Sequence, residues 1–177
     1  NNISEKLCAA GFEVIRFEFP YMAERRLSGK KRPPDRAPKL MAAFEEAIKE
    51  ISVAKNLIIG GKSMGGRMAS MLAATATVNI DGVLCLGYPF HPPGKPEKLR
   101  VEHLPNITVP TLIIQGERDP FGGSALIETL SLPPQITVSI APDGNHDLAP
   151  RKRSGISHAD NLKQATETIT KFFGTDL

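Results

Sequence analysis

Residues 57–66 read LIIGGKSMGG, and this stretch decides the fold. The first three residues are a short, continuously apolar run, which predicts a buried strand. A Gly-x-Ser-x-Gly pattern with Ser63 at its centre follows, and a stretch rich in small residues and methionine over 65–76 predicts a helix. Strand, sharp turn and helix in this order predict a turn that holds a serine side chain above the edge of a parallel sheet.

The glycines around this serine have a physical role. A serine in so sharp a turn adopts a strained backbone, so Cβ atoms on its neighbours are expected to collide. Gly61 and Gly65 would remove those atoms, and Gly66 would let the helix pack against the strand. The hydroxyl of Ser63 then projects from the sheet, while the backbone N–H of Met64 faces a developing oxyanion. The N-terminus of the helix adds partial positive charge there.

The pentapeptide alone leaves other interpretations open. A glycine-rich turn between strand and helix can serve packing only, or it can hold a phosphate group. The phosphate-binding pattern G-x-x-x-x-G-K-S/T does not fit, because Asn56 stands where its first glycine belongs. The choice therefore depends on residues farther along the chain.

Two such residues complete the order serine, acid, histidine. Asp119 follows an apolar run at 111–114, and His146 follows another at 136–140. The carboxyl ends of parallel strands meet at one edge of a sheet, so both side chains are expected beside Ser63. A neutral His146 would take the proton of Ser63, and Asp119 would hold the imidazole in the required tautomer. The three residues together predict a serine-nucleophile hydrolase.

Other histidines and carboxylates are weaker candidates. We expect His158 to be a solvated residue of the last helix and His103 to lie on the surface. His91 borders the same sheet edge and is expected to form a wall of the pocket, with a tentative role in substrate binding. Asp143 and Asp147 lie too close in sequence to the candidate base to orient it, so we expect them to stabilise its loop.

Basic side chains near the expected mouth bear on the substrate. Lys62 and Arg118 are tentative substrate-binding residues. If two of Arg67, Arg118, Arg151 and Lys152 converge, the substrate is expected to be an anionic acyl compound. Ordinary surface charge is the simpler interpretation of all four.

The whole chain alternates apolar runs with amphipathic stretches. This pattern predicts a single α/β domain, with a doubly wound, mainly parallel sheet and helices on both faces. Helices are expected at residues 3–10, 41–51, 65–76, 123–130 and 157–173, the last with a capping box between Ser157 and Asp160. Strands are expected at 12–19, 57–59, 83–86, 111–114 and 136–140, and a loop over the basic stretch 24–36.

Composition excludes several classes of protein. A chain of 177 residues with a net charge of +3 fits one domain and does not require nucleic acid as a partner. No apolar run approaches the ~18 residues that span a bilayer, so no membrane partner is expected. Cys8 and Cys85 are predicted to be buried free thiols, which favours the cytoplasm. Neither a Cys/His metal spacing nor a dinucleotide fingerprint is present, so we expect no metal and no cofactor.

Five segments carry a resemblance to a known family. They are residues 16–22, 31–36, 60–70, 86–96 and 144–148. In them the chain resembles the α/β-hydrolase superfamily, and within it small hydrolases related to the α/β-hydrolase-like domain of regulatory subunit three of the nonspecific-lethal histone acetyltransferase complex. The resemblance implies the α/β-hydrolase fold and a Ser–Asp–His triad, and it implies no particular substrate.

The resemblance also implies an N-terminally incomplete domain spanning residues 1–177. In α/β hydrolases a loop before the first large helix supplies a second oxyanion donor. Here that helix is expected to start at residue 3, so the N-terminal strands and this loop are expected to be missing, with a gap in the sheet.

Two functions from different classes remain open. The short segment between residues 86 and 111 leaves no room for a lid domain, so an open site for small acyl substrates is expected, as in an esterase or thioesterase. The alternative is a non-catalytic α/β-hydrolase-like module that binds another protein. A large apolar surface patch away from Ser63 would favour that alternative. The sequence does not fix the oligomeric state.

Overall fold

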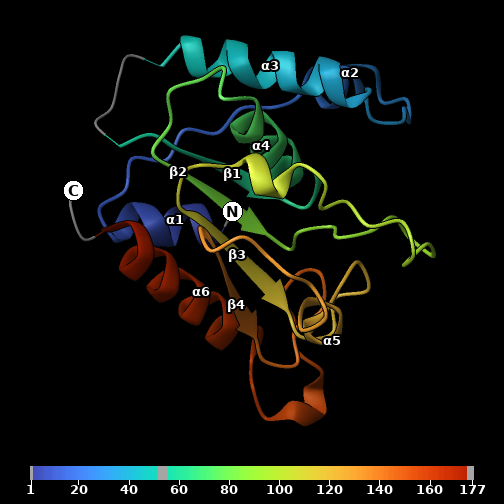
Figure 1. Cartoon of the computed structure of the whole chain (residues 1–177), viewed down its shortest axis with the longest axis vertical. Helices are drawn as coiled ribbons and strands as arrows, with labels where there is room; N and C mark the ends of the chain where they lie inside the picture. The colour runs from blue at the N-terminus through green and yellow to red at the C-terminus, as the bar shows by residue number, and fades with distance from the viewer. Residues whose placement is uncertain (1, 52–55, 175–177) are drawn as a thin grey trace.

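The centre of the molecule is a four-stranded parallel sheet with the strand order β1-β2-β3-β4. The computed structural model describes residues 2–51 and 56–174. The strands are β1 (Ile58–Lys62), β2 (Gly82–Leu86), β3 (Thr111–Gly116) and β4 (Ile136–Ala141). Because all four run in the same direction, their arrowheads in Figure 1 lie at one edge of the sheet.

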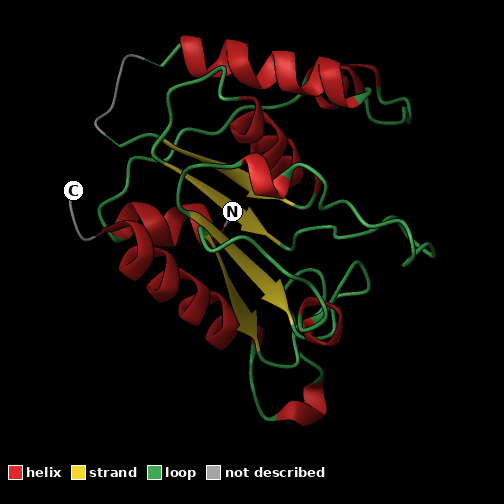
Figure 2. Cartoon of the chain, in the orientation of Figure 1, coloured by secondary structure: helices red, strands yellow, loops and turns green. Residues whose placement is uncertain are grey.

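Helices cover both faces of this sheet (Figures 1 and 2). On one face α4 (Met64–Thr75) packs on β1 and β2, and α3 (Ala37–Lys49) lies outside it. On the other face α6 (His158–Phe173) packs on β3 and β4 beside α1 (Asn2–Ala9). The predicted fold class, an α/β domain with a parallel sheet between two layers of helices, is confirmed. The shorter elements are α2 (Pro20–Ser28), α5 (Ser124–Ile127), η1 (Leu104–Asn106) and η2 (Lys152–Ser154).

The hydrophobic core forms two layers because successive side chains of a strand point to opposite faces. In β3, which is buried along its whole length, Ile113 packs in the layer of α4 with Leu72. Its neighbours Leu112 and Ile114 pack in the layer of α6 with Ile169. This double coverage explains why the middle of the strand, residues 112–114, is continuously apolar.

Most predicted elements are confirmed, including the start of the last helix. There the Asp160 N–H donates to Ser157 Oγ at 3.1 Å, and the Ser157 N–H donates to Asp160 Oδ2 at 2.9 Å. This reciprocal pair satisfies two of the N–H groups that a helix leaves free at its start. The helix expected over 123–130 is shorter, since only α5 is helical.

The strand predicted over residues 12–19 is wrong. This segment has no regular secondary structure and pairs with no strand of the described chain. Its apolar alternation is compatible with a strand, but a strand also needs a hydrogen-bonded neighbour, which a local pattern cannot supply. Ile15 and Phe17 stand 57% and 40% exposed as a result.

The loop predicted over residues 24–36 is partly wrong, because α2 extends into it. Pro20 starts this helix where its missing N–H costs nothing. Gly29 ends it in the left-handed region with φ 68° and donates its N–H to the carbonyl of Arg25. The helix was not predicted because its polar sequence shows no apolar stripe, although most of its residues have good helix propensity.

The two cysteines differ. Cys85 is buried as predicted, and burial raises the pKa of its thiol to about 12. Cys8 is exposed, so its predicted burial is wrong. Leu7 is the residue that α1 buries against α6, and the adjacent position on a helix points elsewhere. Within the described residues no helix is long and apolar enough to cross a membrane.

Candidate active site

Ser63 occupies the turn between β1 and α4 in a strained conformation. Its φ of 53° and ψ of −116° lie outside the regions that residues with a side chain normally adopt. Its N–H donates to the carbonyl of Leu86 at 2.8 Å, and its carbonyl accepts from the N–H of Arg67 at 3.0 Å. These bonds to β2 and to the first turn of α4 maintain the strain that lifts the side chain above the sheet.

The glycines of this turn have unequal roles. A Cβ on Gly61 would lie 3.0–3.2 Å from backbone atoms of Gly65 and Gly66. A Cβ on Gly66 would lie 2.6 Å from the carbonyl oxygen of Gly61 and 3.1 Å from Cys85 Cα, so this glycine lets α4 approach the sheet. A Cβ on Gly65 would meet no atom within 4 Å, so the steric role predicted for Gly65 is wrong.

The structure brings the three sequence-predicted residues into one hydrogen-bonded chain. His146 Nε2 lies 2.9 Å from Ser63 Oγ, and His146 Nδ1 lies 2.8 Å from Asp119 Oδ2. The Asp119 side chain is fully buried, whereas the His146 side chain is 20% exposed. A buried acid, a histidine and an accessible hydroxyl in this order can transfer a proton away from the hydroxyl.

Asp119 is held by two further donors. The N–H of Phe121 donates to its Oδ1 at 2.9 Å, and Gln115 Nε2 donates to its Oδ2 at 3.0 Å. The Phe121 ring also packs against the imidazole of His146, with 4.5 Å between ring centroids. The carboxylate and the imidazole are therefore fixed on two sides.

Gln115 is the residue of this site that sequence reasoning missed. Its side chain is fully buried in β3. Its Oε1 accepts from the N–H of Tyr88 at 2.7 Å, and its Nε2 lies 3.0 Å from the Tyr88 carbonyl and 2.7 Å from the Gly122 carbonyl. Gln115 is the only polar side chain in residues 112–116 of this otherwise apolar strand, and a buried polar side chain needs partners. This was the signal in the sequence that could have indicated its role.

The loop that carries His146 fits closely against two glycines. A Cβ on Gly87, whose φ is +63°, would lie 2.9 Å from the carbonyl oxygen of His146 and 3.2 Å from its Nδ1. A Cβ on Gly116 would lie 2.2 Å from the carbonyl oxygen of Asn145. The backbone of this loop therefore rests directly on the ends of β2 and β3.

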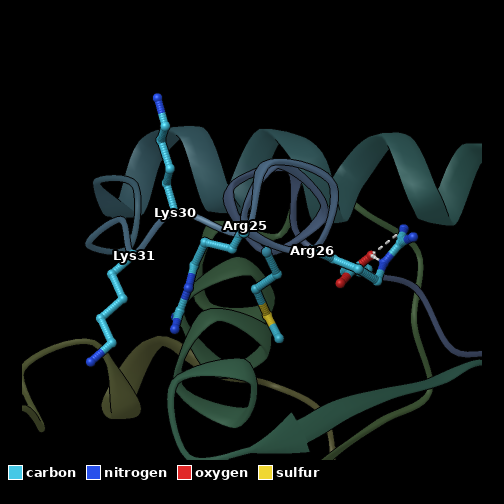
Figure 3. Close-up of a pocket in the computed structure, with 7 residues that line it drawn as sticks. Arg25, Arg26, Lys30 and Lys31 are labelled. Carbon is cyan, nitrogen blue, oxygen red and sulfur yellow. Dashed lines mark hydrogen bonds and ion pairs between the residues drawn. The ribbon is translucent and has the colours of Figure 1, made fainter.

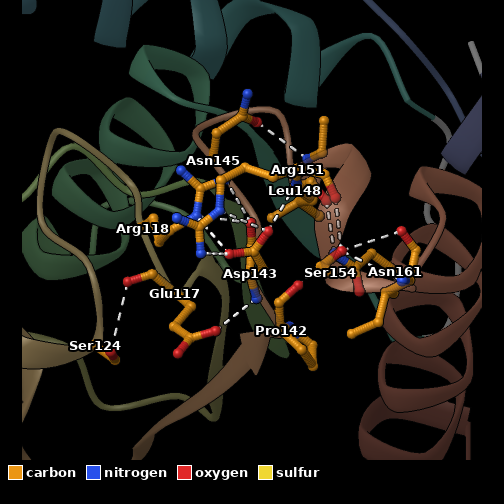
Figure 4. A network of polar contacts seen from close by, with 12 residues as sticks. Glu117, Arg118, Ser124, Pro142, Asp143, Asn145, Leu148, Arg151, Ser154 and Asn161 are labelled. Carbon is orange, nitrogen blue, oxygen red and sulfur yellow. Dashed lines mark hydrogen bonds and ion pairs between the residues drawn. The ribbon is translucent and has the colours of Figure 1, made fainter.

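Asp143 fastens the same loop through a network of polar contacts (Figure 4). Its carboxylate accepts from Arg118 Nε at 2.8 Å and from the Arg151 N–H at 2.7 Å, and it is also bonded to the Arg151 guanidinium. Its own N–H donates to Glu117 Oε2 at 2.5 Å. The hydrogen bonds from Arg151 hold the pKa of Asp143 well below its usual range. Of the four basic residues considered for an anionic substrate, Arg118 and Arg151 converge, but they do so around a carboxylate of the chain itself.

Comparisons with known proteins identify the family of this chain. The model of the alpha/beta hydrolase domain family matches residues 1–174. The chain belongs to that family.

Solved structures share its fold. A monoacylglycerol lipase of Paleococcus ferrophilus superposes with a TM-score of 0.70 at 15% identity, covering 97% of this chain and 88% of the lipase. An α/β serine hydrolase homologue from Coxiella burnetii gives 0.66 at 14% identity, covering 97% and 76%. The esterase domain of a Rhodothermus marinus protein gives 0.64 at 17% identity, covering 96% and 76%. At these identities the likeness concerns the fold alone.

Lys62, one of the tentative substrate-binding residues, forms an ion pair with Asp147. Their side chains are 52% and 61% exposed, and the hydrogen bond from Lys62 lowers the pKa of Asp147. The exposed His158 donates from Nε2 to the Asp147 carbonyl at 2.9 Å. Lys62 precedes Ser63 and Asp147 follows His146, so this ion pair links the turn that carries the serine to the loop that carries the candidate base.

Of the remaining histidines, His91 is buried and His103 is partly buried. His91 is 7% exposed, and its Nδ1 lies 2.9 Å from the Pro92 carbonyl. His103 is not on the surface as expected: its Nε2 lies 2.9 Å from Ser70 Oγ, and burial lowers its pKa to about 4.

The Ser70–His103 pair differs from a nucleophile and its base. Ser70 is fully buried within α4, and its hydroxyl donates to the Arg67 carbonyl at 2.8 Å. With that proton so engaged, the histidine donates to the serine oxygen instead of accepting from it. A buried hydroxyl that accepts from the histidine is not activated as a nucleophile, so this hydrogen bond has a structural role.

An open groove of about 380 Å³ lies elsewhere, along α2 and the residues that follow it (Figure 3). Arg25, Arg26, Lys30 and Lys31 line it, and Arg26 is paired with Glu18 at 2.9 Å. Neither the serine, the acid nor the base of the hydrogen-bonded chain lines this groove. Among the described residues no group of three potential metal-binding side chains occurs.

Proposed function

We propose that this chain is a serine hydrolase in which Ser63 is the nucleophile, His146 the general base and Asp119 the residue that orients the base. The observation that carries the proposal is the unbroken hydrogen-bonded chain from Ser63 Oγ through both ring nitrogens of His146 to a buried carboxylate. The buried carboxylate of Asp119 is stabilised by its three hydrogen-bond donors. An imidazole that donates from one ring nitrogen to such a carboxylate can accept a proton at the other nitrogen.

The reaction follows from this geometry. His146 Nε2 accepts the hydroxyl proton while Ser63 Oγ attacks the carbonyl carbon of the substrate. The Met64 N–H, one of the groups that α4 leaves free at its start, stabilises the oxyanion together with the positive end of the helix. Collapse expels the alcohol or thiol, which takes the proton from His146 and leaves an acyl-enzyme. Water then attacks the acyl carbon, gives a proton to His146 and releases the acid with the Ser63 hydroxyl restored.

The substrates that suit this site are small esters or thioesters. The residues between β2 and β3 contain only the short helix η1, and no lid covers the serine from that segment. Asp119 and His146 need no metal or cofactor for the proton transfer. His91 contributes to the wall after β2, while Arg118 acts on the site through the loop that it fastens.

A fluorophosphonate probe tests this proposal, because it phosphonylates activated serines. We expect one adduct on the wild-type chain, mapped to the peptide with Ser63 and absent from Ser63→Ala. The matched control is Ser70→Ala, which removes a serine of the same region that also contacts a histidine; it should still be labelled. Asp119→Asn should reduce the labelling rate by ~10³-fold or more.

One specific observation favours a second candidate, a module that binds another protein. Among the described residues four large apolar side chains stand exposed, and all of them lie between residues 15 and 27: Ile15, Phe17, Met22 and Leu27. Exposed apolar surface of this kind marks interaction sites. The resemblance to a chromatin-complex subunit belongs with this alternative, and the structural relatives named above lend that relation no support. Folded wild-type protein that takes no label at any serine would reject the hydrolase and favour the module.

A further inference from the structure

Two arginines, one of them in the first turn of the helix that follows the proposed nucleophile, form no ion pair among the described residues. Arg67 lies in the first turn of α4, and its N–H bonds the carbonyl of Ser63. Its Nε is buried without a hydrogen-bond partner. Neither it nor Arg100 forms an ion pair with any described residue. A buried guanidinium nitrogen without an acceptor costs free energy unless a ligand supplies one.

The backbone of Arg100 is hydrogen-bonded to the segment that follows β2. Its N–H donates to the Phe90 carbonyl at 2.8 Å, and its carbonyl accepts from the Tyr88 hydroxyl at 2.8 Å. Tyr88 in turn follows Gly87, the residue whose Cα faces His146. Arg100 is thus fixed to the segment that leaves β2 next to the proposed base.

The charges of the two arginines act on each other. Partial burial lowers the pKa of Arg100, and the positive charge of Arg67 lowers it further. Glu102 acts on Arg100 in the opposite sense, but it is exposed and forms no ion pair with it. Burial and the charge of Arg67 lower the pKa of His103 to about 4, so its imidazole is neutral near pH 7 and supplies no counter-charge. The two arginines therefore create a positive field that the exposed Glu102 offsets only in part, and no described carboxylate forms an ion pair with either of them.

The arginines around Asp143 show the contrast. Arg118 and Arg151 also approach each other, but one carboxylate bonds both of them. Around Arg67 and Arg100 the chain offers no equivalent group among the described residues. Guanidinium groups bind carboxylates in a planar, bidentate geometry, and such bonds are stronger when partly buried.

We propose that Arg67 and Arg100 bind a carboxylate of the substrate, so that the hydrolase acts on acyl esters whose acyl chain ends in a second, free carboxylate. This inference rests on the proposed function. It gives the site a substrate class: half-esters or half-thioesters of short dicarboxylic acids. The ester carbonyl lies at Ser63, and the free carboxylate lies at the two arginines.

A pair of chromogenic esters of equal chain length tests the inference. We compare mono-4-nitrophenyl glutarate with 4-nitrophenyl pentanoate, which lacks the terminal carboxylate, and measure kcat/KM for both. The wild-type chain should prefer the glutarate ester. Arg67→Gln and Arg100→Gln should each lower the ratio of the two kcat/KM values by about tenfold, mainly through KM, and Arg67→Lys should retain part of the preference. Arg153→Gln, which removes an exposed arginine of η2, is the matched control and should leave the ratio unchanged.

A binding measurement separates failure of this inference from failure of the proposed function. Free glutarate should raise the melting temperature of the wild-type chain and slow fluorophosphonate labelling, and both effects should be lost in Arg67→Gln. A labelled and active enzyme with equal preference for both esters overturns the carboxylate site alone. A chain that binds glutarate but takes no label overturns the hydrolase and keeps the site. If Arg67→Gln melts far below the wild type, Arg100→Gln and Arg67→Lys decide the question.

Discussion

Replacing Gln115 by leucine should weaken both the fold and the proposed catalytic chain. The side chain is fully buried and connects β3 to the Tyr88 backbone, to the Gly122 carbonyl and to Asp119. Leucine fills a similar volume but offers no polar atom. The substitution therefore removes hydrogen bonds without opening a large cavity.

The magnitude follows from which groups lose their only partner. The Tyr88 carbonyl keeps a bond from the Phe90 N–H at 3.0 Å, so it remains satisfied. The Tyr88 N–H and the Gly122 carbonyl are left buried with no other bond in the structure. At about 1–3 kcal/mol for each of these two groups, the free energy of unfolding should fall by about 2–6 kcal/mol. Asp119 loses one of three donors, so labelling of Ser63 should slow by about tenfold.

Urea unfolding followed by circular dichroism at 222 nm measures the stability, since the chain has no tryptophan. Fluorophosphonate labelling at low urea, where the variant is folded, measures the effect on the nucleophile. Gln135→Leu is the control because Gln135 is only partly buried and its side chain makes one hydrogen bond among the described residues, to the Ile107 carbonyl. It should lose about 1 kcal/mol and label at the wild-type rate.

The reasoning would be refuted by a Gln115→Leu variant that loses no more stability than Gln135→Leu and labels at the wild-type rate. That result would mean that water or backbone shifts replace the amide at little cost. A loss of stability with unchanged labelling would retain the structural role and reject the role toward Asp119.

Three further predictions concern Gly87, His103 and Lys62. Gly87→Ala should slow labelling at least tenfold, because the new Cβ would meet the His146 backbone at 2.9 Å; Gly94→Ala has nearly the same φ and open space, so it should label normally. His103 of the unfolded chain takes up a proton near pH 6.5, whereas in the folded chain it does so only near pH 4. The free energy of unfolding should therefore decrease as the pH is lowered from 6.5 to 4, by about 1–2 kcal/mol after allowing for partial exposure. His103→Gln should remove that dependence in urea titrations at pH 7 and 4.5. Lys62→Gln breaks an exposed ion pair and should change the labelling rate less than threefold, with the difference vanishing in 0.5 M salt; a larger, salt-resistant effect would show that Lys62 contacts the reacting groups.

Local patterns were sufficient for most of the fold and for the hydrogen-bonded chain. The alternation of apolar runs and helical stretches predicts β1 to β4, α4 and α6 within a few residues of their observed bounds. Ser63, Asp119 and His146 were found because each follows a parallel strand, and parallel strands end at a common edge. Recognising the strands, recognising the residues that follow them and knowing that parallel strands end at a common edge are therefore enough to bring together residues far apart in the chain.

Local patterns failed where structure depends on a distant partner. Residues 12–19 alternate as a strand does, yet no described strand pairs with them. The burial of His103 depends on its approach to Ser70, 33 positions earlier. The periodicity of a segment fixes the direction of its side chains but not what they meet.

The sequence by itself determined the parallel α/β domain, the turn around Ser63 and the order of the three residues, because these depend on local geometry and strand direction. Only the tertiary structure decided the partners of the charged and polar groups: Gln115 for Asp119, Asp143 for Arg118, and no carboxylate for Arg67. The physical reason is that a hydrogen bond or ion pair acts over about 3 Å, and positions in the chain do not reveal which groups folding brings within that distance.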